Sequence, residues 1–265
     1  MGYAIELAIL CDTGKRRHTN QDNFWYAGKF LESENNGLTP PIAESIDNTN
    51  TPILAVFDGM GGERYGEVAA YVAAKALDEA TKPGIGDDLS RFLADACTSM
   101  NNAVCAYAES NKVGRMGSTA AIIAFGKKKV HVCNLGDSGI FLRDSKNLTQ
   151  ISQDHVVQVP NLKKFPLSQH LGVHEEEFTI EPHLATGDYN SGDRYLICTD
   201  GLTDMVPFEE IDSILTQGLN VAETADLLME KALEYGGKDN ITIILCEVKR
   251  KKLSLKNLFK KKAKT

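Results

Sequence analysis

The sequence is poor in the features that mark secreted, fibrous or membrane-spanning proteins. Its 265 residues include only six cysteines, eight prolines and one tryptophan. The cysteines are scattered without short paired spacings and most lie in apolar runs, which predicts buried free thiols in a reducing compartment rather than disulfides or a cysteine metal site. The longest apolar runs reach only about five or six residues, as at 53–57, and are too short to cross a bilayer. No secretory signal is visible, so we expect a cytoplasmic protein.

Charge is unevenly distributed along the chain. The formal net charge is −7, from 29 basic and 36 acidic residues. Residues 249–265 hold nine basic and no acidic side chains, which leaves 20 basic against 36 acidic side chains over residues 1–248. We therefore predict a folded domain over 1–248 and a basic C-terminal tail over 249–265. The tail is either a solvated chain end or a weak contact for an anionic membrane or a nucleic acid.

Hydrophobic patterning predicts a globular α+β chain of hairpins and paired helices. The composition, with 42% hydrophobic and 25% charged residues, is that of a globular domain. Helical patterns occupy 67–81, 89–110, 208–217 and 221–235, and strand patterns occupy 3–11, 24–26, 53–57, three runs within 119–143, 148–152, 195–198 and 241–248. Residues 28–51 and 154–193 are polar, which predicts loops. Hairpins and paired helices indicate antiparallel sheets covered by helices.

Aspartates recur next to the predicted strands. Asp58 and Asp200 follow strands, whereas Asp22 and Asp239 precede them. Because the end of one strand lies beside the start of its neighbour in an antiparallel sheet, these four side chains can gather at one edge, where Asp137 can join them. Each aspartate taken alone has a simpler role as a turn residue. Their shared placement is what predicts a site.

A cluster of carboxylates needs positive charge. Four carboxylates side by side resist ionisation, and two divalent cations would balance their formal charge. A ligand set of oxygens without histidine or cysteine favours Mg²⁺ or Mn²⁺ over zinc. The glycines after Asp58 let the backbone pass close to an ion, so the Gly59 carbonyl is a further candidate ligand. A dinucleotide-binding loop is disfavoured here, because Arg64 occupies the third glycine position and Asp58 would repel a pyrophosphate.

Seven short motifs in a fixed order carry a family resemblance. They are GKRRHTNQD (14–22), VFDGMGG (56–62), GSTA (117–120), NLGDS (134–138), DH (154–155), TDGL (199–202) and KDNIT (238–242). From about residue 4 to residue 248 the sequence resembles the type 2C family of metal-dependent Ser/Thr protein phosphatases, especially its compact bacterial-style members. The resemblance implies an α+β fold, a four-layer αββα sandwich in which two antiparallel β-sheets are flanked by pairs of helices. It also implies that residues 1–248 form the catalytic domain.

The resemblance implies a two-metal site with Mg²⁺ or Mn²⁺. Asp58 would bridge two ions, with the Gly59 carbonyl on one of them and Asp200 and Asp239 on the other. Asp137 corresponds to a possible third, weaker metal position. Cations that share a water lower its pKa and so make hydroxide available at neutral pH.

The implied reaction is hydrolysis of phosphoserine and phosphothreonine in phosphoproteins, the products of Ser/Thr kinases. Asp22, also one of the metal-site residues, would orient the metal-bound water. Arg17 would hold the substrate phosphate, because its guanidinium fork matches two oxygens at once. Arg17, Asp22 and Asp58 are thus the catalytic residues of this hypothesis. Met60 stands where many animal members have a histidine, and a thioether cannot donate a proton. The alternative is a pseudo-phosphatase that acts as a signalling binding module. We expect a monomer.

Overall fold

The chain folds into two antiparallel sheets. The computed structural model describes residues 2–60, 65–160, 162 and 165–251. In spatial order, the first sheet contains β3 (Ile42–Asp47), β1 (Tyr3–Asp12), β12 (Ile241–Arg250), β11 (Arg194–Cys198), β8 (Gly139–Arg143) and β9 (Leu148–Gln150). The second contains β10 (His183–Asp188), β7 (Lys129–Leu135), β6 (Ala120–Phe125), β4 (Ile53–Met60) and β2 (Asp22–Tyr26), with β5 (Gly117–Ser118) paired to β4.

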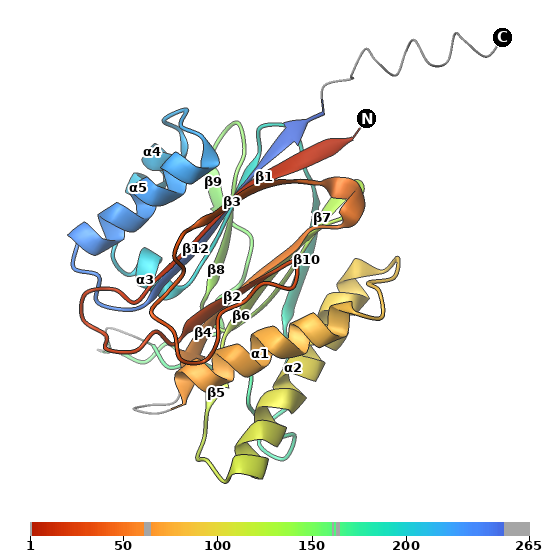
Figure 1. The fold of residues 1–265 in the computed structure, drawn as a ribbon, viewed down its shortest axis with the longest axis vertical. Helices are drawn as coiled ribbons and strands as arrows, with labels where there is room; N and C mark the ends of the chain where they lie inside the picture. The colour runs from red at the N-terminus through yellow and green to blue at the C-terminus, as the bar shows by residue number, and fades with distance from the viewer. Residues whose placement is uncertain (1, 61–64, 161, 163–164, 252–265) are drawn as a thin grey trace, which may run out of the picture.

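Helices cover the outer face of each sheet. The second sheet is covered by α1 (Gly66–Thr81) and α2 (Leu89–Asn111). The first sheet is covered by α3 (Asp200–Thr203), α4 (Phe208–Leu215) and α5 (Val221–Glu234). The two groups of helices lie on opposite sides of the molecule (Figure 1), with a short 3₁₀ turn, η1 (Asn48–Asn50), at the end of β3. The structure thus confirms the predicted pairing of helices on antiparallel sheets.

Local sequence explains why the helices form where they do. In α1 the buried side chains recur every three or four residues and are mostly alanine, namely Ala69, Ala70, Ala73, Ala74 and Leu77. Such small residues let the helix lie close to the sheet. At the start of α5, the side chain of Asn220 accepts hydrogen bonds from the backbone of Ala222 and Glu223, and Glu223 bonds back to Asn220. This capping box fixes the first turn of α5.

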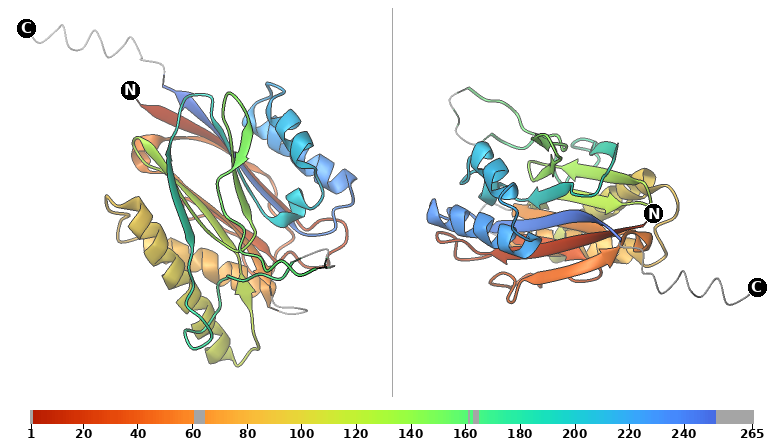
Figure 2. Two further views of the ribbon diagram at one scale, coloured as in Figure 1. Left: turned by 180° about the vertical axis from the view of Figure 1, so that it is seen from behind. Right: turned by 90° about the horizontal axis from the view of Figure 1, so that it is seen from above.

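Three hydrophobic clusters fill the spaces between four layers. One cluster lies between α1, α2 and the second sheet, with Phe57 and Leu93 among its members. A central cluster lies between the two sheets, around Phe24, Phe125 and Tyr195. The last lies between the first sheet and α3–α5. The views in Figure 2 show the same stacking from behind and from above, so the predicted four-layer αββα sandwich is confirmed.

The structure also differs from the sequence-based expectations. Two strands, β3 and β10, lie in the segments 28–51 and 154–193 that were predicted to be loops. Strand β4 continues through Met60, three residues beyond the predicted end. Strand β12 runs to Arg250, so the first two residues of the predicted tail belong to the first sheet. Residues 252–265 and the glycine turn at 61–64 lie outside the described residues.

The cysteine prediction agrees with the structure. All six thiols are free, and five are buried, while Cys105 is partly exposed. Every helix in the described part of the chain is too short or too polar to span a membrane.

Candidate active site

Both sheets contribute aspartates to one region. In the second sheet, Asp22 begins β2 and Asp58 lies near the end of β4, and the two are directly paired across the ladder. In the first sheet, Asp200 follows β11 and starts α3, whereas Asp239 lies just before β12. Because β11 and β12 are antiparallel neighbours, the end of one lies beside the start of the other. The structure therefore brings the four predicted aspartates together where the two sheets meet.

Asp22 is buried at the centre of this region. Its Oδ2 accepts hydrogen bonds from the hydroxyls of Thr199 and Thr242, each at 2.8 Å. The pKa of Asp22 is raised to about 7, mainly by burial and also by the charges of Asp200 and Asp239, against the lowering effect of the two threonine hydroxyls. The Asp22 carboxyl thus titrates near neutral pH.

Asp58 is held through its backbone by Thr119, which lies between β5 and β6. Its N–H donates to the Thr119 hydroxyl at 2.9 Å, and its carbonyl accepts from the Thr119 N–H at 2.9 Å. Burial, followed by the charges of four neighbouring aspartates, raises the pKa of Asp58 well above its ordinary value. In order of effect these neighbours are Asp200, Asp22, Asp239 and Asp137. All five carboxylates of the sequence hypothesis are therefore close enough to interact.

Arg17 contacts the cluster from the loop between β1 and β2. Its Nη2 lies 2.7 Å from Asp239 Oδ2, and the arginine side chain is 47% exposed. The hydrogen bond to Asp239 raises the pKa of Arg17, and the charges of Asp58 and Asp200 add to the effect. The guanidinium thus stands at the open side of the acidic cluster.

Gly59 occupies a position that has no room for a side chain. Its N–H donates to the Gln21 carbonyl at 3.0 Å. A Cβ built there would collide with the carbonyl of Gly66 and lie 2.6 Å from that of Gln21. Glycine is therefore required here by close packing against the backbones of Gly66 and Gln21, and the role of the Gly59 carbonyl as a metal ligand stays a prediction.

An acidic cavity opens onto these residues. It has a volume of about 340 Å³ and is lined by Asp58, Asp137 and Asp200, with Met60, Thr119 and the segment 165–167 completing the wall. The lining does not include Asp22, Asp239 or Arg17. Their charges nevertheless act on the aspartates that do line the cavity. We call it the acidic cavity below.

The donor set fits hard divalent cations. Carboxylates crowd together around the acidic cavity, and oxygen-only ligands suit Mg²⁺ and Mn²⁺. As the side chains stand, no three His, Cys, Asp or Glu residues within the described ranges are arranged to hold one ion. Oδ2 of Asp239 contacts Arg17, so a cation at Asp239 would share this carboxylate with the guanidinium or compete with it.

Sequence reasoning missed the residues that hold the aspartates in place. The hydroxyls of Thr199 and Thr242 fix Asp22. The side chain of Asn240 accepts from the Gln21 N–H and donates to the carbonyls of Thr13 and Thr19. Asn240 thereby ties the start of β12 to the loop that carries Arg17. Their position in the sequence could have revealed them, because each lies next to, or within three residues of, a predicted aspartate.

Comparisons with known proteins agree with this geometry. The protein phosphatase 2C family model matches residues 43–235. A serine/threonine phosphatase stp of Listeria welshimeri is 31% identical over 255 residues, covering 89% of this chain and 93% of the relative. The serine/threonine protein phosphatase PstP of Mycobacterium tuberculosis is 35% identical over 236 residues, covering 83% of this chain and 45% of PstP.

A solved structure shows the same fold. The crystal structure of the catalytic domain of PstP in complex with two manganese ions superimposes with a TM-score of 0.75 at 30% identity, covering 94% of this chain and 100% of the other. Together with the family match and the ordered motifs, this similarity identifies the chain as a member of the protein phosphatase 2C family.

Proposed function

We propose that this protein is a Mg²⁺- or Mn²⁺-dependent phosphatase that hydrolyses phosphoserine and phosphothreonine in phosphoproteins. The observation that carries the proposal is the convergence of aspartates from both sheets on one acidic cavity. The relatives named as serine/threonine phosphatases, and the PstP structure with its two manganese ions, support the substrate class and the cofactor.

Five groups of this chain are suited to hold cations. Asp58 would bridge two ions, the Gly59 carbonyl would complete one, and Asp200 and Asp239 would complete the other. Asp137, on the wall of the acidic cavity, is placed for a third and weaker ion. When bound, such ions lower the pKa of a water and offset the negative charge that otherwise keeps phosphate out.

The remaining residues of the site position the reactants. Asp22, fixed by two threonine hydroxyls, accepts a hydrogen bond from the attacking water and so orients it. Arg17 binds the phosphate oxygens of the substrate through its two parallel donors. The ion pair with Asp239 uses only Nη2 of Arg17, so the other N–H groups of the guanidinium remain available to phosphate oxygens.

Phosphate release from phosphopeptides tests the proposal. We expect phosphoserine and phosphothreonine peptides to be hydrolysed with Mn²⁺ and not after chelation by EDTA. Asp58→Asn and Asp239→Ala should each reduce kcat at least about a hundredfold while the circular dichroism spectrum stays unchanged. Asp226→Asn, at an exposed position of α5, is the matched control and should keep full activity. Full turnover by EDTA-treated protein would rule the metal mechanism out.

The pseudo-phosphatase alternative has a separate signature. A binding module that has lost catalysis lacks part of its catalytic set, whereas every aspartate of the predicted set is present here. Calorimetric titration that detects no Mn²⁺ binding at millimolar concentration would favour the alternative.

For the basic tail we propose weak binding to anionic phospholipid surfaces. The sequence 252–265 contains six basic residues and no acidic residue. Residue 251 still belongs to the domain, because its N–H donates to the Gly2 carbonyl at 3.1 Å. Deletion of 252–265 should therefore leave the melting temperature unchanged and lower co-sedimentation with phosphatidylserine vesicles. Unchanged sedimentation, or binding to DNA alone, would contradict this proposal.

Two further expectations belong to the proposal. A reducing cytoplasm suits a chain whose six cysteines are all free. A monomer is expected, and light scattering after gel filtration should give a mass close to 29.0 kDa.

A further inference from the structure

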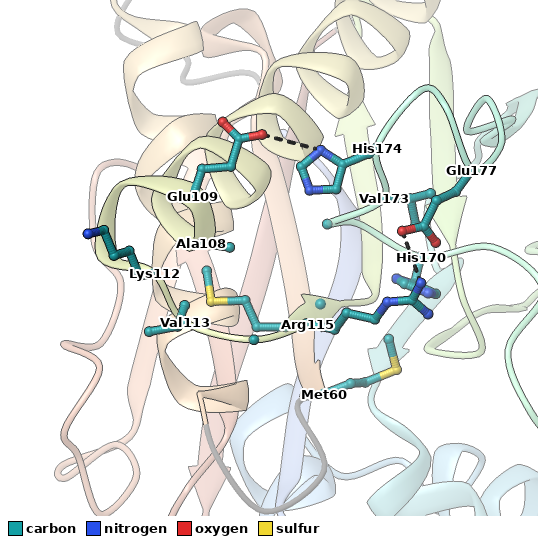
Figure 3. A pocket seen from close by; sticks show the side chains of 14 residues that line it. Met60, Ala108, Glu109, Lys112, Val113, Arg115, His170, Val173, His174 and Glu177 are labelled. Atoms are coloured by element: carbon teal, nitrogen blue, oxygen red, sulfur yellow. Dashed lines mark hydrogen bonds and ion pairs between the residues drawn. The ribbon is translucent and has the colours of Figure 1, made fainter.

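A second and larger cavity adjoins the acidic cavity. Its volume is about 650 Å³, and it shares the side chain of Met60 with the acidic cavity. One wall is the C-terminal part of α2 with the loop that leads to Gly117, and the other is the segment 170–177 (Figure 3). We call this second cavity the flanking pocket. A molecule bound at the aspartates can extend past Met60 into it.

Much of the flanking pocket's lining is apolar. Met60, Val113, Met116 and Val173 all line it. Met116 and Val173 are each only 4% exposed, so they form a fixed surface rather than mobile side chains. Figure 3 shows Met60, Val113 and Val173 around the flanking pocket. A surface of this kind stabilises an apolar group that leaves water.

The charged residues of the flanking pocket lie mostly in pairs that join its two walls. Arg115 Nη2 lies 3.2 Å from Glu177 Oε1, and His174 Nδ1 lies 3.5 Å from Glu109 Oε1. Both pairs are drawn in Figure 3. The charges of Arg115 and Glu177 offset one another, and Lys112 is solvated at an exposed position. The flanking pocket therefore offers no buried fixed charge that would select an ionic group.

From these features we infer that the flanking pocket binds an apolar side chain of the phosphoprotein substrate. The inference rests on the proposed phosphatase function and names a specificity determinant for it. Met60 lines both cavities, so they adjoin each other. Because an extended peptide advances about 3.3–3.6 Å per residue, we expect the apolar residue close in sequence to the phosphoresidue. The substrates are thus phosphopeptides with Leu, Ile, Met or Phe near the phosphorylated side chain.

A matched peptide series tests this specificity. Each phosphothreonine peptide carries a single Leu or, in its partner, a single Ser at one of the positions −3 to +3, with alanine elsewhere. At one or two of these positions we expect kcat/KM to be about tenfold higher for Leu than for Ser, which is the discrimination that an apolar pocket typically provides. p-Nitrophenyl phosphate, which has no flanking residue, measures the Mn²⁺-dependent chemistry alone.

Filling the flanking pocket should remove the preference. Gly114 lines it, and a Cβ added there meets no atom within 4 Å, so Gly114→Phe can be accommodated without a clash at its Cβ. This variant should hydrolyse Leu and Ser peptides equally and keep the wild-type rate on p-nitrophenyl phosphate. Ser110→Phe is the matched control, because Ser110 is exposed on α2 and lines a different groove. It should keep the preference for Leu. Val113→Asp, which adds a charge to the lining, should lose it.

The outcomes separate the inference from the function on which it rests. Equal rates on Leu and Ser peptides at every position of the wild type, with normal turnover of p-nitrophenyl phosphate, would overturn the flanking-pocket inference alone. A preference that persists in folded Gly114→Phe would do the same. Absence of Mn²⁺-dependent turnover on all substrates would instead contradict the proposed function.

Discussion

Asp22 is a buried carboxylate whose ionisation is linked to folding. The pKa of an aspartate in an unfolded chain is about 3.9, whereas burial raises the pKa of Asp22 in the folded protein to about 7. Because the folded state holds the proton more tightly, the contribution of this group to stability is fully present below pH ~4 and is lost as the pH rises through about 7. A carboxylate in a salt bridge has the opposite effect, because its contribution to stability is lost as the pH falls.

We therefore predict that the protein in EDTA loses stability between pH 4 and pH 8, by at most about 4 kcal/mol from Asp22. Asp22→Asn removes this charge and should flatten the dependence, so that the variant melts at a higher temperature than the wild type at pH 8. Thermal melts followed by circular dichroism across this pH range measure the effect. Asp226→Asn should behave like the wild type. Identical pH profiles for wild type and Asp22→Asn would refute the linkage.

Thr242 fixes the same carboxylate by a single hydroxyl. Its Oγ1 donates to Asp22 Oδ2 at 2.8 Å, inside a fully buried environment. Thr242→Val keeps the shape and removes the donor, so we predict a fall in kcat of about tenfold or more with little change in KM. Thr242→Ser keeps the hydroxyl and should stay within about threefold of wild type. Steady-state kinetics on p-nitrophenyl phosphate with saturating Mn²⁺ tests this, and equal loss in both variants would point to packing instead.

At the residue scale, the aspartates of the site were easier to predict than the side chains that hold them in place. The aspartates stand out in the sequence because a role in a turn explains any one of them, but does not explain why several lie at strand ends. The threonine and asparagine side chains that hold them do not stand out, because a hydroxyl or amide has many uses in a turn or strand. Their role is visible only once β2, β11 and β12 are adjacent.

Helix α3 and the start of β12 form one element-scale unit. Gly201, the second residue of α3, packs against the Asn240 carbonyl so closely that an added Cβ would collide with it. This contact places Asp200 beside Asp239. We predict that Gly201→Ala destabilises the protein by about 2 kcal/mol, because overpacking forces the two segments apart. Urea unfolding measures the change.

A glycine in open space is the control for Gly201. Gly114→Ala adds the same methyl group where no atom lies within 4 Å, and it should change the free energy of unfolding by less than about 0.5 kcal/mol. Equal effects at Gly201 and Gly114 would show that the close approach of α3 to β12 contributes little to stability.

Elements with a buried face were predictable, whereas the edge strands β3 and β10 were not. Helix α1 was expected over 67–81 and spans Gly66–Thr81, because its apolar face repeats at the helical period. Strands β3 and β10 each lie at the edge of a sheet and pair on one side only. No residue of either strand is fully buried, so neither shows an apolar run. Their pairing with β1 and β7 depends on partners far away in the sequence.

At the scale of the whole molecule, the active site is also a junction between layers. Asp22 and Asp58 belong to the sheet that carries α1 and α2, whereas Asp200 and Asp239 lie just beyond the ends of β11 and β12 in the sheet that carries α3–α5. The central cluster of apolar side chains holds these sheets together over their length. At their meeting edge, the like charges of the aspartates oppose that packing.

Divalent cations should therefore stabilise the entire fold and not only the site. A ligand that binds the folded state alone, at about 100 times its dissociation constant, adds about 2.7 kcal/mol, and for a chain of this size each kcal/mol raises the melting temperature by roughly 2–4 °C. We predict that saturating Mn²⁺ raises the melting temperature of the wild type by about 5–10 °C. Asp239→Ala, which removes a proposed metal ligand next to the first sheet, should lose most of this rise, while Asp226→Asn should keep it. A wild-type melting temperature that does not respond to Mn²⁺ would mean that the two sheets share no cation.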